Sequence, residues 1–269
     1  MDPIYLGGLG LAFLSIIVSM VMDGNSPGAL IGPSSFVLVV FGSIGATLMA
    51  YRKSAVSAII PSFKAALGNT PPELDDVVQA LGPLADVARR EGMLALESRV
   101  TDIEDPFLRN GVQLLVDGLD TEQISETMQI EIAAVDERHK TMIGFWKSLG
   151  GYAPTLGMLG TVIGLINMLG NLSDPAQLGA GMSLALLTTL YGVLFSNLVF
   201  LPVANRLENL NKAELAARDM ALDGIVALQS GVSSRMLVER LETYLPAERR
   251  LGHQARSGGV AAAPSAEAA

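Results

Sequence analysis

Four long stretches of the sequence contain no charged residue. They are 20, 28, 26 and 31 residues long, and they lie between Asp2 and Asp23, Asp23 and Arg52, Lys147 and Asp174, and Asp174 and Arg206. A helix of about 20 apolar residues crosses the hydrocarbon core of a bilayer, and it satisfies its own backbone polar groups there. The pattern predicts four membrane-spanning helices. The alternative, buried helices of a soluble protein, requires four such segments in a chain of 269 residues.

The four spans form two hairpins. We expect the first hairpin at residues 1–51, with spans at about 4–22 and 30–51, and the second at 142–204, with spans at about 148–172 and 179–204. The other segments are expected to be a cytoplasmic helical loop at 52–141, cytoplasmic helices at 205–250, and a disordered Ala/Gly/Ser-rich tail at 251–269. The predicted fold class is an all-α membrane protein whose spans 3 and 4 extend into the cytoplasm.

The basic residues predict the orientation. Of the 18 Lys and Arg residues, ten lie between Arg52 and Lys147 and eight between Arg206 and Arg256. Basic residues stay on the cytoplasmic side of a membrane, so we expect both chain termini in the cytoplasm. The first apolar segment lacks a positively charged start and a small-x-small cleavage site, so we interpret it as a retained span rather than a signal peptide. The predicted location is the bacterial inner membrane.

Composition excludes several kinds of chemistry. The chain has no cysteine, which excludes disulfides and thiol chemistry, and its two histidines, His139 and His253, have no ligand spacing. No phosphate-binding loop or nucleophile elbow is present, so the chain is not expected to be an enzyme. Residues 52–147 carry 16 Asp and Glu against ten Lys and Arg, which argues against a nucleic-acid partner.

Hydrophobic periodicity predicts helices outside the spans. A helical pattern runs over residues 74–81 after two prolines, with Pro83 marking a kink or a new start. A long pattern opens at residues 120–122 and merges into span 3, so we expect one continuous helix there. Span 4 is expected to continue to about Ser230, and a short amphipathic helix is expected from Ser233 to Tyr244.

The predicted spans contain no Asp, Glu, Lys or Arg. Transporters and pumps place such residues inside the membrane, where they are costly and therefore functional. If this chain handles ions, the titrating group must come from another chain.

Small residues and a proline mark span 3. Gly157, Gly160 and Gly164 recur at helical spacing and form a strip against which another helix could lie. Pro154 cannot donate a hydrogen bond to Gly150, so it is expected to kink the helix and to leave a carbonyl acceptor free.

Two further groups could carry function. Thr161 and Thr189 could offer hydroxyl oxygens to a hard cation, although a threonine in a helix often bonds its own helix carbonyl instead. In the loop, Arg89, Arg90 and Glu97 place opposite charges close together, and Arg90 and Glu97 are two helical turns apart if the helix persists through Gly92. The alternative for the loop is a solvated, salt-bridged surface.

Three segments carry a resemblance to a known family. Residues 89–97, 153–165 and 185–202 read RREGMLALE, APTLGMLGTVIGL and ALLTTLYGVLFSNLVFLP. With them, residues 1–246 resemble the MotA/PomA family of flagellar motor stator proteins. The resemblance implies a pentamer around two copies of a single-span MotB/PomB-type partner, whose membrane carboxylate carries the ion. It also implies membrane lipid around the complex and a FliG-type rotor protein as the target of torque.

The resemblance also implies roles for individual residues. It assigns rotor contact to Arg89, Arg90 and Glu97, and a conformational step to Pro154 and Pro202. The partner-facing ion pathway comprises Thr161, Thr189, Gly157, Gly160, Gly164 and Tyr191. No resident cofactor or metal is implied. The translocated ion is Na⁺ or H⁺, with Na⁺ favoured and bound in transit at Thr161 and Thr189, because sodium-driven relatives resemble this chain in having both threonines.

Three alternatives remain from the sequence. An ExbB/TolQ-type energiser also surrounds a partner helix, but such proteins resemble a three-span plan, whereas two hydrophobic segments precede Arg52 here. A stand-alone channel or transporter would conduct ions without a partner. A structural membrane scaffold would conduct none.

Overall fold

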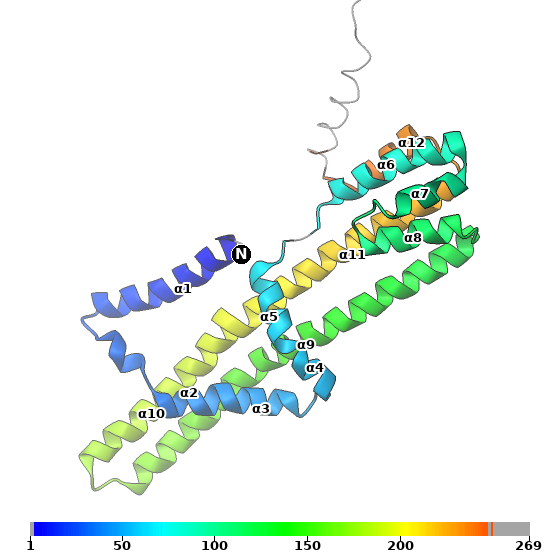
Figure 1. Cartoon of the computed structure of the whole chain (residues 1–269). Coiled ribbons are helices and arrows are strands. Elements are labelled where there is room, and N and C mark those ends of the chain that lie inside the picture. Colours follow the sequence, from blue (N-terminus) through cyan, green and yellow to red (C-terminus); the bar gives the residue numbers. More distant parts are fainter. Residues whose placement is uncertain (1–2, 71, 247–248, 250–269) are drawn as a thin grey trace, which may run out of the picture. The chain divides into compact units, whose positions relative to one another are not determined.

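The computed structural model of the chain describes residues 3–70, 72–246 and 249. The predicted disordered tail at 251–269 lies outside these residues. The described part contains helices, turns and connecting segments and no strand, so the all-α prediction is confirmed. The chain splits into two compact units, Met1–Thr70 with Glu137–Asn211 and Pro71–Asp136 with Lys212–Ala269. Figure 1 shows the elements in the order of the chain.

The first unit begins with apolar helices of modest length. They are α1 (Pro3–Met22), a 3₁₀ turn (Pro27–Leu30), α2 (Pro33–Phe36), a π-helical turn (Val37–Phe41), α3 (Gly42–Leu48), α4 (Lys53–Ser57) and α5 (Ile59–Gly68). The second predicted span starts at Pro33 rather than at residue 30, because Gly32 is the N-cap and proline favours the first helical turn. The corresponding apolar stretches, Gly7–Met22 and Pro33–Leu48, are shorter than the two long helices that follow.

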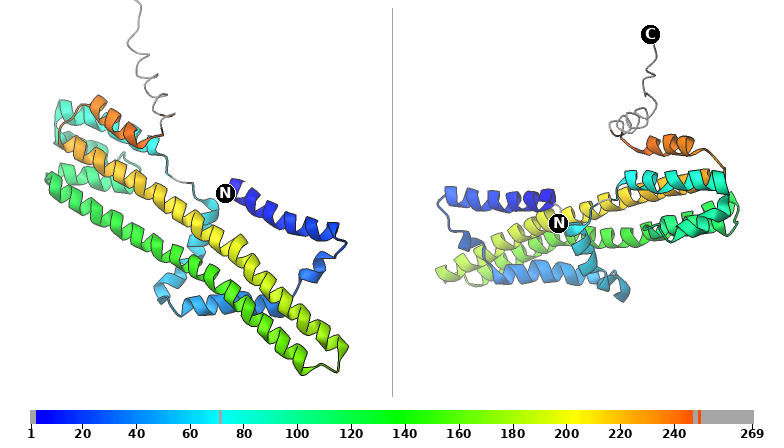
Figure 2. Two further views of the ribbon diagram at one scale, coloured as in Figure 1. Left: turned by 180° about the vertical axis from the view of Figure 1, so that it is seen from behind. Right: turned by 45° about the horizontal axis from the view of Figure 1, so that its top comes forward.

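Two long helices complete the first unit and continue in the second. α9 spans Thr121–Gly170 without a break, which confirms the predicted continuous helix. α10 (Pro175–Leu194), a π-helical turn (Phe195–Phe200) and α11 (Leu201–Gln229) follow each other directly. Both α9 and the run Gln177–Gln229 are long and apolar enough to cross a membrane. Figures 1 and 2 show α9 and α10 side by side as an antiparallel pair.

An aromatic core holds the first unit together. Phe145, Trp146 and Leu149 of α9 are buried with Phe200 and Val203. The Trp146 ring centroid lies 5.8 Å from that of Phe145 and 6.3 Å from that of Phe200. Large aromatic side chains bury much apolar area at low conformational cost, so this core fixes α9 against the start of α11.

The second unit packs four helices of its own, parts of two long helices and short 3₁₀ turns around an aliphatic core. Its own elements are α6 (Leu74–Glu91), α7 (Glu97–Val100), α8 (Pro106–Val116), α12 (Ser234–Leu241) and 3₁₀ turns at Met93–Leu96 and Glu242–Tyr244, completed by parts of α9 and α11. α6 runs through Pro83 without a new start, and the predicted helix after Ser233 is confirmed. Leu81, Met220, Ile225, Leu237 and Leu241 are fully buried in the core.

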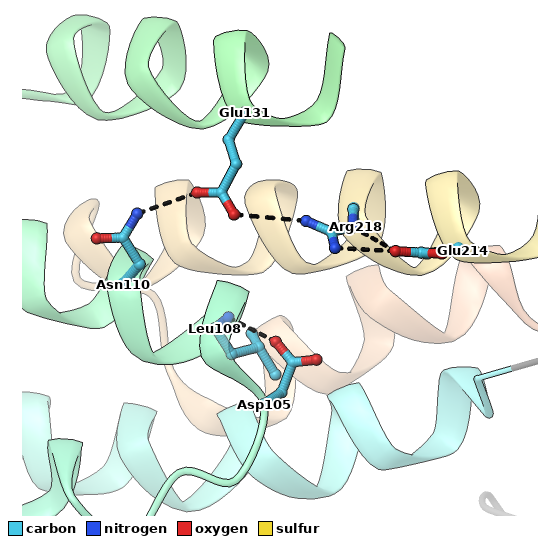
Figure 3. Close-up of polar contacts among 6 residues, drawn as sticks. All are labelled: Asp105, Leu108, Asn110, Glu131, Glu214 and Arg218. Atoms are coloured by element: carbon cyan, nitrogen blue, oxygen red, sulfur yellow. Dashed lines mark hydrogen bonds and ion pairs between the residues drawn. The ribbon is translucent and has the colours of Figure 1, made fainter. Parts of the chain in front are cut away.

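Polar contacts order the outer side of this core (Figure 3). The Arg218 guanidinium lies 4.9 Å from the Phe107 ring centroid, donates to Glu214 at 2.9 Å and faces Glu131 at 3.5 Å. The Asp105 carboxylate accepts a hydrogen bond from the Leu108 N–H at 2.8 Å and so caps the start of α8. These contacts serve the fold, and none of them uses a residue that the sequence singled out.

Candidate functional site

The three glycines of span 3 lie against α10 of the same chain, and we call this contact between α9 and α10 the seam. A Cβ added to Gly157 would lie 2.8 Å from the Thr188 carbonyl oxygen, and one on Gly164 would lie 2.7 Å from the Ala185 nitrogen. The strip on α9 therefore receives α10 of the same chain at backbone distance. The predicted strip thus receives another helix, which is α10 of the same chain, and a role of these glycines toward a partner stays a prediction.

α10 contributes a matching strip that the sequence analysis missed. A Cβ on Gly192 would lie 2.8 Å from the Ala153 carbonyl oxygen, and one on Gly181 would lie 2.9 Å from the Gly164 carbonyl oxygen. Gly181, Ala185, Thr188 and Gly192 recur at the spacing of one helix face. That spacing is the signal that could have paired α10 with α9.

Thr161 and Thr189 meet across this seam. Their hydroxyl oxygens are 2.6 Å apart. The Thr161 hydroxyl also lies 3.1 Å from the Gly157 carbonyl oxygen, and the Thr189 hydroxyl lies 3.3 Å from that of Ala185. Each hydroxyl thus has a carbonyl oxygen of its own helix within reach, as the alternative from the sequence expects, and the two hydroxyls also contact each other. That they bind a cation stays a prediction.

The threonine pair offers oxygens but no charge. Thr189 is exposed and Thr161 is half-buried. A hydroxyl has one proton and two lone pairs, so whichever of the two donates to the other, lone pairs remain on both oxygens. Hard cations prefer such oxygen ligands. Among the described residues no three His, Cys, Asp or Glu side chains cluster at a metal-binding distance, and a cation here needs its countercharge from elsewhere.

Pro154 leaves a carbonyl free, and Ser196 uses it. The Ser196 hydroxyl, 2% exposed, donates to the Gly150 carbonyl oxygen at 2.7 Å. This confirms the predicted acceptor near Gly150. Ser196 was missed, because a serine within an apolar span gives no signal of the helix it will contact.

The backbone of the same serine belongs to the irregular helical turn that precedes Pro202. The π-helical turn Phe195–Phe200 directly precedes Leu201 and Pro202, and the Leu201 N–H donates to the Ser196 carbonyl oxygen, five residues back. π-helical turns are frequent at functional sites. Ser196 therefore links the carbonyl released by Pro154 to the widened helical turn before Pro202.

Tyr191 contacts the N-terminal part of its own chain. Its hydroxyl donates to the Leu30 carbonyl oxygen and accepts a hydrogen bond from the Gly32 N–H at 3.0 Å. Its ring centroid lies 6.4 Å from that of Phe36 and 6.0 Å from that of Phe195. These contacts engage its hydroxyl and its ring within the chain, and the place of Tyr191 on a partner-facing pathway stays a prediction.

The charged loop motif lies at the end of α6. α6 ends at Glu91, and Gly92 has φ +91° and ψ 166°, a conformation essentially restricted to glycine. The helix does not persist through Gly92, so the condition under which Arg90 and Glu97 would lie two turns apart on one helix is not met. Arg89 and Arg90 end α6, and Glu97 begins α7 after a 3₁₀ turn.

The side chains of this motif are exposed. Arg89, Arg90 and Glu97 are exposed, and none of them forms an ion pair with another described residue. Of the alternative, a solvated and salt-bridged surface, the described residues show the solvent exposure without the salt bridges. A shallow hollow beside them is lined by Glu91, Leu94, Ala95, Glu97 and Ser98, so the motif presents unpaired charge around a hollow with both polar and apolar lining.

The sequence is similar to a known protein family and to curated proteins of it. Residues 99–220 match the model of the MotA/TolQ/ExbB proton channel family. The chain is 34% identical over 252 residues to motility protein A of Bacillus subtilis (strain 168), covering 93% of each. It is 36% identical over 250 residues to chemotaxis protein PomA of Vibrio alginolyticus, covering 93% of this chain and 98% of that protein.

Two solved structures share the fold. One is described as the structure of C. jejuni MotAB, with a TM-score of 0.87 at 31% identity, covering 92% of this chain and 97% of that one. The other is the flagellar MotAB stator complex from Bacillus subtilis, with a TM-score of 0.86 at 33% identity, covering 92% and 98%. The chain therefore belongs to the MotA/TolQ/ExbB proton channel family, in its MotA/PomA group of flagellar motor stator proteins.

Proposed function

We propose that this chain is the ring subunit of a flagellar stator that, with a MotB-type single-span partner, converts an ion-motive force into torque on a FliG-type rotor. The observation that carries this proposal is the seam of α9 and α10, where two hydroxyls meet in a segment without any charged residue. The similar structures are of complexes with a MotB chain, which supports such a partner here.

The partner supplies the ion-carrying group. No Asp, Glu, Lys or Arg occurs between Lys147 and Asp174 or between Asp174 and Arg206. Translocation through a low-dielectric region needs a titratable or charged group at that depth, so a carboxylate on the partner's span completes the path. The family resemblance supports five copies of this chain around two copies of the partner.

The threonine pair favours sodium as the translocated ion. Thr161 and Thr189 offer free lone pairs at an exposed edge of the seam. A sodium ion moving with the partner's carboxylate gains oxygen ligands there, whereas a proton needs none. Proton transport remains the alternative for the same ring.

Torque requires a link between ion passage and the rotor-facing motif. Pro154, Ser196 and the π-helical turn before Pro202 form a joint in the membrane segments, where the regular α-helical bonding of both helices is interrupted. Arg89, Arg90 and Glu97 present unpaired charges in the second unit. On this proposal the joint switches as the partner's carboxylate is loaded, and the motif pushes on complementary charges of the rotor.

A motility assay tests the function. Deleting the gene should leave flagellated cells that do not swim, and the wild-type copy should restore swimming whose speed rises with external sodium at fixed pH and membrane potential. Normal swimming of the deletion strain would refute the stator role. A restored speed that follows pH and ignores sodium would keep the stator and replace sodium with the proton.

The family model also covers TolQ and ExbB proteins, which makes an energiser of a periplasmic or outer-membrane system the second candidate. It predicts normal swimming of the deletion strain together with a defect in outer-membrane energisation. A stand-alone channel predicts ion flux in vesicles that contain this chain alone, whereas the stator proposal predicts flux only when the partner is present.

A further inference from the structure

Two short helices between the first apolar segments and the second unit have a buried and an exposed face. On the buried face of α5, Ser62 and Ala66 lie one turn apart. The indole N–H of Trp146 donates to the Ser62 hydroxyl at 3.0 Å, and the Phe63 ring lies 5.6 Å from the Trp146 ring at 31°. α5 is therefore fastened to α9 at one defined place.

Beside this contact, α4 and α5 also carry apolar side chains that no described residue covers fully. Ile60 is 68% exposed, Val56 40% and Phe63 36%, and Met49 just before them is 85% exposed. Single exposed apolar side chains are ordinary on protein surfaces. Here Val56 of α4 and Ile60 of α5 lie on either side of the break at Ala58. Phe63 follows one turn after Ile60, with its ring also in contact with Trp146, and the three side chains make an apolar patch.

Basic residues border this face, and no acidic residue accompanies them. Arg52, Lys53 and Lys64 are the only charged residues between Asp23 and Glu73. All three are exposed, and none forms an ion pair with a described residue. Lys64 lies one turn beyond Ile60, so its aliphatic stem can cover the apolar face while the ammonium group stays at the rim.

Aromatic residues place this surface at one depth of a membrane. Trp146 contacts α5, and the Tyr51 ring lies 5.4 Å from that of Phe145, the neighbour of Trp146. Tyr and Trp concentrate at membrane–water interfaces. The charge-free stretch 24–51 ends at Tyr51, and the stretch 148–173 begins two residues after Trp146. Both aromatic residues therefore stand at the end of a predicted span.

We propose that α4 and α5 are a docking surface for anionic phospholipids of the cytoplasmic leaflet. Val56, Ile60 and Phe63 lie against the acyl chains, and Arg52, Lys53 and Lys64 bind the phosphate groups. This inference deepens the proposed function, because it rests on the membrane placement that the stator proposal requires.

Charge complementarity favours a lipid over a protein as the occupant. A second copy of this chain could cover the face only with a surface that supplies acidic groups. The predicted spans that end or begin near this face, residues 24–51 and 148–173, contain none, and Glu208, which lies beside Lys147, is already paired with it. An anionic bilayer supplies both parts, since it offers a hydrocarbon layer and phosphates directly above it. Each basic residue near such a surface strengthens binding by about fivefold at moderate salt.

The single tryptophan of the chain reports on this surface. Trp146 is the only Trp in the sequence and contacts α5. The full chain is placed in phosphatidylcholine vesicles that contain a minor fraction of a quencher lipid brominated near the headgroup, either phosphatidylglycerol or phosphatidylcholine. We expect brominated phosphatidylglycerol to quench Trp146 fluorescence several-fold more than brominated phosphatidylcholine, because the anionic lipid accumulates at α4 and α5.

Two sets of substitutions provide the comparison. Arg52→Gln with Lys53→Gln and Lys64→Gln should abolish the excess quenching by phosphatidylglycerol and keep the quenching by phosphatidylcholine. Arg99→Gln with Lys212→Gln and Arg235→Gln removes the same charge from the second unit and should keep the excess. If the first variant fails to fold, two measurements still decide: the difference in quenching between the two lipids in the wild type, and the reduction of that difference in Lys64→Gln alone.

Two outcomes would overturn the proposal. Equal quenching by both lipids in the wild type means that the surface does not select charge, and quenching by neither means that protein covers it. Swimming separates this inference from the stator function. A chain without lipid preference that restores motility refutes only the docking surface, whereas a preference in a chain whose deletion leaves swimming normal refutes only the stator.

Discussion

At the residue scale, the seam between α9 and α10 depends on the absence of side-chain atoms. Thr188 is fully buried, and a Cβ on Gly160 would lie 2.5 Å from its methyl carbon. Without a hydrophobic driving force in lipid, helices associate through close van der Waals contact between small residues. The threonine pair can form only because the seam brings the two backbones this close.

Gly160→Ala tests the seam. The added methyl group forces Thr188 or a helix to move, and overpacking of this kind costs about 1–3 kcal/mol. Gly151→Ala in the same helix is the matched control, since nothing lies within 4 Å of its added Cβ and alanine is the better helix former by about 1 kcal/mol. Thermal unfolding of the purified chains should show a lower midpoint for Gly160→Ala only. An equal effect of both substitutions would contradict the seam.

Thr161→Ala tests the hydroxyl pair. It removes one of two oxygens that are 2.6 Å apart, so we expect swimming speed to depend less on external sodium. Thr155→Ala is the control, because the Thr155 hydroxyl bonds only its own helix at Tyr152, and Thr161→Ser should retain the wild-type response. A Thr161→Ala strain with an unchanged sodium titration would remove this residue from the ion path.

At the element scale, the regular backbone hydrogen bonding of two neighbouring helices is interrupted where the helices contact each other. In α9 the loss of the N–H at Pro154 frees the Gly150 carbonyl, and in the α10–α11 run the π-helical turn widens the helix before Pro202. Ser196 connects the two irregularities through one hydrogen bond. A helix whose internal bonds are replaced by a bond from a neighbour can bend only together with that neighbour.

Ser196→Ala and Pro154→Ala together test this connection. Ser196→Ala leaves the buried Gly150 carbonyl without its donor and should cost about 1–3 kcal/mol of unfolding free energy. In a Pro154→Ala background, the alanine that replaces the proline supplies an N–H to the Gly150 carbonyl, so the same serine substitution should cost less. The double-mutant cycle measures this coupling. Identical costs in the two backgrounds would show that the serine and the proline act independently.

At the scale of the whole molecule, the long helices could be predicted from the charge-free stretches, because a charged side chain is costly at any depth of the hydrocarbon layer. The partner of the glycine strip could not be predicted, since a strip on one helix does not identify the helix that fills it. The break at Gly92 was missed because the spacing of Arg90 and Glu97 alone fits a continuous helix. Only the coordinates show that Gly92 has φ +91° and ends α6. The contacts of Tyr191 with Leu30 and Gly32 could not be predicted, because these residues lie about 160 positions away in sequence.

Charge reversal in the loop motif tests whether the second unit transmits force. Arg89→Glu or Glu97→Arg should strongly reduce swimming while membrane insertion and association with the partner remain normal, because both side chains are exposed and form no ion pair within the described chain. Arg99→Glu, also exposed in the second unit but two residues further along the chain, is the control and should swim normally. Swimming speed and copurification of the partner are measured in parallel. Unpaired exposed charges contribute little to the stability of the unit itself. A loss of motility without loss of the complex therefore places the partner of these charges outside the chain. Wild-type swimming of the double reversal would mean that these charges make no contact with the rotor that torque requires.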